Sequence, residues 1–114
     1  QLYEDMVKEK ESGKVQIILT EGLLTLYDDA ILSLLDLKLY VDCRADERIL
    51  RRLKRNMQRG LSEDEITDVY LDVVRYRHDQ YVEPSKWRAD MILNGANPSV
   101  VSMEMITDYI KRLL

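Results

Sequence analysis

The sequence predicts an α/β fold, in which a parallel sheet is flanked by helices. Three observations support this prediction. Short, largely apolar runs typical of strands alternate with longer stretches whose apolar residues recur at helical spacing. Glycine or proline residues stand at the ends of several of these runs. The 114 residues contain no internal repeat and no low-complexity linker, so they fit within a single domain.

The expected strands are short apolar runs, which are typical of strands buried on both faces of a parallel sheet. Their sequences are VQIILTEG, LKLYVD and ADMILNG, at residues 15–22, 37–42 and 89–95. Because strand–helix–strand connections are right-handed, the helices between them should cover both faces of the sheet.

The expected helices have recognisable ends. Asp28 or Asp29 can cap a helix start, and Gly60 is well placed to end a helix that precedes it. Ser62 and Glu65 have the spacing of a capping box, and Pro84 should stop the helix that begins there. Helices are therefore expected before Ser12-Gly13, over residues 28–36 and 45–59, from Ser62 to Pro84, and from Val100 to the C-terminus.

The helix at residues 45–59 is unusually basic. It holds six of the seventeen lysines and arginines of a chain whose net charge is −4. Four of them fall on one narrow stripe of the helix, here called the arginine stripe: Arg48, Arg52, Arg55 and Arg59. The opposite side is apolar and should pack on a core, through Ile49, Leu50, Leu53 and Met57. With the helix that follows Gly60, this helix should form a hairpin that can act as a lid.

Two carboxylates are expected near the start of the arginine helix. Glu21 and Asp42 lie at the carboxyl ends of two expected strands, where parallel sheets bind their ligands. Glutamates of this kind hold magnesium, directly or through water, in phosphoryl-transfer enzymes. Arginine binds phosphate with a planar fork of donors. This constellation suits a magnesium–phosphate ligand.

Simpler interpretations of these residues remain open. A charged helix face is often only a solvated surface, and a glutamate before a glycine is often part of a turn. His78, the only histidine, is expected to be a partly exposed helix residue, not a metal ligand, because no second histidine or cysteine pair is nearby. Tyr76, Tyr81 and Trp87 are expected to pack, not to stack on bases.

Composition excludes several classes of function. The negative net charge argues against a general nucleic-acid-binding surface. No apolar run approaches the roughly 20 residues that cross a bilayer. The single cysteine, Cys43, is expected to be a small buried side chain in a reducing cytosol. No GxxxxGK[ST] motif is present, so the sequence lacks the loop that cradles ATP phosphates.

Two stretches of the sequence resemble the C-terminal half of proteins of the uridine kinase–phosphoribulokinase family. They read ILTEGLLTLYDDAILSLLDLKLYVDCRADERILRRLKRNMQRG and YVEPSKWRADMILNGA, and the likeness runs from about Ile18 to the C-terminus. The resemblance implies a P-loop kinase fold in which residues 1–114 form the C-terminal part of one domain. It also implies transfer of the γ-phosphate of ATP to the 5′-hydroxyl of uridine or cytidine, with Mg²⁺, in the cytoplasm.

The resemblance assigns roles to five residues. Glu21 matches the glutamate associated with Mg²⁺, and Arg52 matches a residue that contacts the nucleoside. Arg55 and Arg59 match lid arginines that reach the phosphates, and Asn97 lies in the loop that approaches the adenine of ATP. The phosphate loop and the catalytic aspartate are expected upstream of Gln1. No catalytic residue is therefore expected within the chain, and the chain alone should be inactive.

Two departures from the family pattern affect the expected substrate. Leu61 and Val69 stand where the family has polar residues, an arginine and a glutamine that helps to read the pyrimidine. A related kinase acting on another hydroxylated small molecule is therefore a second interpretation. A third is a non-catalytic module that binds nucleotides or other anions. Bare apolar surface beside the strands should also favour a homo-oligomer.

Overall fold

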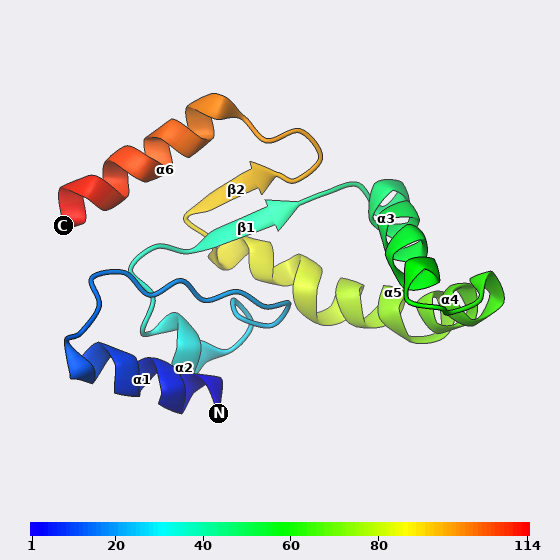
Figure 1. Ribbon diagram of the computed structural model, residues 1–114, viewed down its shortest axis with the longest axis horizontal. Helices are drawn as coiled ribbons and strands as arrows, with labels where there is room; N and C mark the ends of the chain where they lie inside the picture. Colours follow the sequence, from blue (N-terminus) through cyan, green and yellow to red (C-terminus); the bar gives the residue numbers. More distant parts are fainter.

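The computed structural model describes residues 1–114 and confirms the α/β fold (Figure 1). Its two strands, β1 (Leu39–Asp42) and β2 (Met91–Asn94), form a parallel two-stranded sheet. Leu39 pairs with Met91 at one end and Asp42 with Asn94 at the other. Figure 1 places helix α6 and a long helical stretch on opposite sides of these strands. The predicted strands at residues 37–42 and 89–95 are thus confirmed, each two residues shorter at its start.

The helices account for most of the remaining structure. The α-helices are α1 (Leu2–Ser12), α2 (Asp29–Leu32), α3 (Ala45–Gln58), α4 (Glu63–Val69), α5 (Arg75–Arg77) and α6 (Val100–Leu113). Two π-helical segments and one 3₁₀ segment join them: η1 (Tyr70–Val74), η2 (His78–Val82) and η3 (Glu83–Arg88). From α4 to η3 the backbone is continuously helical.

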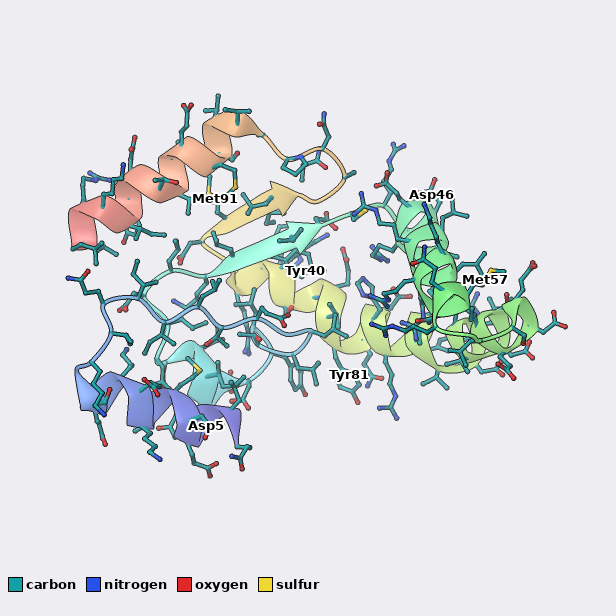
Figure 2. All side chains as sticks on the ribbon, in the orientation of Figure 1. Asp5, Tyr40, Asp46, Met57, Tyr81 and Met91 are labelled. Atoms are coloured by element: carbon teal, nitrogen blue, oxygen red, sulfur yellow. The ribbon has the colours of Figure 1, made fainter.

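Three predicted helix boundaries are confirmed, the starts at Asp28 and Ser62 and the end at Gly60, whereas the helix expected over residues 28–36 ends at Leu32. The Asp28 side chain accepts hydrogen bonds from the backbone N–H groups of Ala30 and Ile31. Ser62 and Glu65 form the full capping box at the start of α4. Between α3 and α4 the chain reverses at Gly60, whose φ of 89° lies in the left-handed region that favours glycine. Helices α3 and α4 therefore form the predicted hairpin; Figure 2 shows Met57 near the turn.

The predicted strand at residues 15–22 is wrong. This segment has no strand structure, and residues 15–21 take part in none of the backbone–backbone hydrogen bonds of the molecule. Its apolar side chains are exposed, Leu19 to 90%. A strand requires a neighbour that satisfies its N–H and C=O groups, and the two-stranded sheet does not pair with this segment. Glu21 consequently does not lie at the end of a strand.

Pro84 does not end the helical stretch as predicted. The proline lies at the start of η3, where its missing N–H is tolerated, and the helix continues in 3₁₀ form to Arg88. Arg88 then holds this end against the start of α2 and the turn before it, through an ion pair with Asp29 at 2.7 Å and a hydrogen bond to the Tyr27 carbonyl.

Few side chains are buried. Only eight of the 114 residues are buried, and the apolar ones come from separate elements: Met6, Leu26, Ile31, Tyr40, Ile66 and Ile106. Helix α3 buries none of its residues, so the prediction that its apolar side packs on a core is wrong for Leu50 and Met57, which are exposed. No helix is both long enough and apolar enough to span a bilayer.

Candidate functional site

A cavity of about 740 Å³ lies at the carboxyl ends of β1 and β2. Strand residues Asp42 and Asn94 line it together with Arg48 of α3 and the acidic Asp79 and Glu83 of the long helical stretch. The predicted position of polar groups beyond the strand ends is therefore observed for Asp42. The cavity combines opposite charges around an open space, which is an arrangement that can bind a polar ligand.

Arg48 has a contact within the chain that the stripe pattern does not reveal. Its side chain is half-buried, and Nη1 donates a hydrogen bond of 2.5 Å to the backbone carbonyl of Cys43. Cys43 lies between β1 and α3, so this bond fastens the start of the helix to the end of the strand. Arg48 therefore has a structural partner within the chain.

Cys43 is also more exposed than predicted. It is half-buried, and its thiol donates a hydrogen bond of 3.0 Å to Oε2 of Glu47. This contact raises the pKa of the Cys43 thiol.

The side chains of the other arginines of the stripe form no hydrogen bond or ion pair within the chain. Arg55 and Arg59 are exposed, and neither forms an ion pair. Arg52 is half-buried, and its Nε is a buried donor without a hydrogen-bond acceptor. An unpaired buried donor costs free energy unless it finds an acceptor. Within the stripe, the guanidinium of Arg48 thus has a hydrogen-bond acceptor in the chain. The other three arginines have guanidinium donors that are free to bind a ligand.

A cluster around Glu83 adjoins the cavity. The Tyr40 hydroxyl donates to Glu83 Oε2 at 3.5 Å, and Lys86 Nζ forms an ion pair with Oε1. His78 Nε2 lies 3.4 Å from Oε2 without hydrogen-bond geometry. Figure 2 shows Tyr40 on β1 beside the helical stretch that contains Glu83. The cluster connects β1 to the helices that cover the sheet.

Burial and contacts within this cluster shift three pKa values, and the hydrogen bond to Glu83 raises the pKa of Lys86. The hydrogen bond from Lys86 lowers the pKa of the Glu83 carboxyl, against the opposing effect of burial. Burial raises the pKa of Tyr40 to about 12, and the negative charge of Glu83 adds to this effect. Sequence reasoning missed this cluster, although the Glu83–Lys86 spacing of three residues is a pattern that indicates an ion pair on a helix. The His78 side chain is 17% exposed within the helical stretch, so the prediction of a partly exposed helix residue is confirmed.

The remaining predicted site residues are not gathered at the cavity. Glu21 is exposed in the unpaired segment before the turn at residues 23–27. Asn97 is exposed in the loop after β2, where its backbone N–H donates to the Asn94 side chain. Neither they nor Arg52, Arg55 and Arg59 line the cavity. No group of three or more His, Cys, Asp or Glu side chains is arranged to hold a metal ion.

Comparison of the chain with known protein families identifies the family to which it belongs. Residues 3–102 match the Phosphoribulokinase / Uridine kinase family. The chain belongs to this family. The resemblance noted in the sequence is thereby confirmed, and the parallel strands with flanking helices are consistent with part of a P-loop kinase fold.

Several curated relatives are named uridine kinase. One from Clostridium botulinum (strain Okra / Type B1) is 43% identical over 111 residues, which cover 94% of this chain and 54% of the relative. One from Clostridium tetani is 44% identical, over 87% of this chain and 48% of the relative. One from Geobacillus kaustophilus is 40% identical, over 86% of this chain and 47% of the relative. The chain thus spans about half the length of the curated relatives it matches.

Proposed function

We propose that the chain is the C-terminal part of a P-loop nucleoside-kinase-like domain, which transfers the γ-phosphate of ATP to the 5′-hydroxyl of uridine or cytidine. The main support is the 43% identity, over nearly the whole chain, to a relative named uridine kinase. The cavity at the strand ends adds support, since α/β folds bind ligands there. The chain would bind ATP and a nucleoside and would act in the cytoplasm. It would bind neither nucleic acid nor a membrane.

In this proposal the arginine stripe binds the substrates. Arg52 contacts the nucleoside, and the unpaired Arg55 and Arg59 contact the phosphates. Free guanidinium groups on one helix face suit this role, because positioning and charge neutralisation account for most of phosphoryl-transfer catalysis. The α3–α4 hairpin would act as the lid that brings these arginines to the ligand, and Asn97 would lie near the adenine.

Magnesium is the implied metal of this reaction. The chain offers one carboxylate for it, Glu21, which is exposed and free of protein partners. One carboxylate fits the metal, because Mg²⁺ is usually bound by one or two carboxylates together with substrate phosphates. When bound, the ion would neutralise charge on the phosphates, and Glu21 would hold it directly or through water.

A different acceptor is the second candidate. Leu61 and Val69, which replace polar residues of the family pattern, are both exposed apolar side chains of the hairpin. A site built from them would offer fewer hydrogen bonds to a pyrimidine and would favour another hydroxylated small molecule. The non-catalytic alternative, in which the free arginines bind nucleotides or other anions without turnover, rests on the same unpaired groups.

A chimera tests these candidates. The half of the Clostridium botulinum relative that this chain does not match would be fused to the chain and assayed with ATP and Mg²⁺. Uridine and cytidine would be compared with ribose and with purine nucleosides as acceptors. Faster phosphorylation of the two pyrimidine nucleosides supports the proposal, whereas a preference for another acceptor supports the second candidate. Binding of ATP without phosphorylation of any acceptor supports the non-catalytic alternative.

A further inference from the structure

The turn that follows Glu21 is a compact unit, here called the Glu21 turn (residues 22–28). Three backbone hydrogen bonds close it, from Thr25 to Gly22 and from Tyr27 and Asp28 to Leu24. Thr25 is buried, and a Cβ at Gly22 would approach its hydroxyl to 3.0 Å. Because Gly22 is bonded directly to Glu21, the placement of this turn constrains where the exposed Glu21 carboxylate lies.

A residue distant in the sequence fastens the Glu21 turn. Arg88 ends η3, and its Nη1 atom reaches three acceptors: Asp29 Oδ1 at 2.7 Å, Tyr27 O at 2.9 Å and Leu26 O at 3.4 Å. The Tyr27 ring also packs edge-to-face on Tyr81 of η2, with the ring centroids 5.3 Å apart. Arg88 and Tyr81 belong to the same continuous helical stretch, so the turn is fixed to a single body.

Arg88 contributes orientation more than stability. Its side chain is 43% exposed and that of Asp29 is 87% exposed, and ion pairs this exposed add little to the free energy of unfolding. The contact between Tyr27 and Tyr81 holds the turn near the helical stretch without fixing its rotation, because a pair of rings offers one point of attachment. Arg88 supplies a second point, at the two carbonyls where the turn ends. Loss of Arg88 should therefore let the turn rotate while the chain stays folded.

We propose that Arg88 is a positioning residue for the metal, because through the Glu21 turn it holds the Glu21 carboxylate in the orientation that binds Mg²⁺. This inference rests on the proposed function, in which Glu21 holds the ion. Removal of a group that orients a metal ligand without touching the metal typically weakens metal binding by roughly 10–100-fold. Arg88 contacts neither the metal nor the substrates in this arrangement. Its loss should therefore weaken binding of the ion and leave the chemical step intact once the ion is bound.

The test uses the chimera and three substitutions. Arg88→Met keeps much of the side-chain length but removes the donors, whereas Arg88→Lys should restore the contacts, because one nitrogen makes all of them. Arg77→Met is the control, since Arg77 is an exposed arginine of the same helical stretch without an ion pair. Binding of Mn²⁺, in place of Mg²⁺, is measured by electron paramagnetic resonance with a non-hydrolysable ATP analogue. We expect the Kd for Mn²⁺ to rise about tenfold or more in Arg88→Met alone, and kcat at saturating Mg²⁺ to stay unchanged.

Two further measurements separate positioning from other effects. In a Glu21→Gln background, Arg88→Met should raise the Kd for Mn²⁺ no further, since Arg88 acts through Glu21. In the chain alone, the amides of the Glu21 turn should exchange faster in Arg88→Met than in Arg77→Met. An unchanged Kd in Arg88→Met, losses that add to those of Glu21→Gln, or equal amide exchange overturns the inference. The expected Mn²⁺ effects in a chimera that transfers no phosphate would support the inference and refute the proposed function.

Discussion

Arg48 and Arg52 lie one turn apart on α3, yet only Arg48 has a partner within the chain. Its hydrogen bond to the Cys43 carbonyl fixes the start of α3, while the Arg52 Nε is buried without an acceptor. Sequence spacing places all four arginines of the stripe on one face, but spacing does not show which of them the fold itself uses. That distinction depends on the path of the backbone between β1 and α3.

The arginines should therefore differ in what their loss affects. In the chimera, Arg55→Ala and Arg59→Ala should each remove a charge-assisted contact to phosphate. Each should lower kcat/KM by an amount equivalent to a loss of about 1.5–3 kcal/mol of transition-state stabilisation. Neither should change the free energy of unfolding. Arg48→Ala should instead lower that free energy by about 1 kcal/mol. Steady-state kinetics and urea unfolding of the three variants separate these effects. Equal small losses of kcat/KM in all three variants would mean that the arginine stripe is only a solvated face of the helix.

Tyr40 provides a pH-dependent prediction. Its pKa is about 12 in the folded chain and about 10 when unfolded, so the folded state holds its proton more tightly. The contribution of Tyr40 to the free energy of unfolding is therefore fully present below pH 10 and is lost as the pH rises through 12. Over this range the wild type should lose on the order of 2 kcal/mol more than Tyr40→Phe does. Urea unfolding at several pH values checks this; parallel curves would contradict it.

Local signals in the sequence predicted the helix ends well, because capping depends on residues only a few positions apart. The Ser62–Glu65 box, the Asp28 cap and the turn at Gly60 all formed as expected. The strand at residues 15–22 did not form, although its apolar run is as strong a signal as those of β1 and β2. A strand depends on a neighbour that can be distant in sequence, and here no neighbour pairs with the segment.

The capping box should stabilise the α3–α4 hairpin. Ser62→Ala removes the acceptor for the Glu65 N–H, at 3.1 Å, and should lower the free energy of unfolding by about 1 kcal/mol. Ser62→Asp is the control, because aspartate also caps helix N-termini. This variant should retain most of the free energy of unfolding. Thermal unfolding measures both. A Ser62→Ala variant as stable as the wild type would show that the hairpin forms independently of this cap.

At the scale of the whole molecule, the fold class and the family could be predicted from the sequence, while the geometry of the site could not. Glu21 was expected near the arginine stripe because parallel strands end at one edge, and Asn97 was expected near the adenine from the family resemblance. In the structure neither lines the cavity at the strand ends, and Glu21 lies outside it because residues 15–21, which would position it, form no strand. Completion of the sheet is therefore the step on which the proposed site depends.

Transfer of the γ-phosphate from ATP to uridine, measured for the chain alone and for the chimera, tests the central claim most directly. The chain alone should show no transfer, because the sequence contains no phosphate-binding loop. The chimera should phosphorylate uridine only when Mg²⁺ is present. Steady Mg²⁺-dependent turnover by the 114-residue chain alone, or a folded chimera that transfers nothing, would contradict the account.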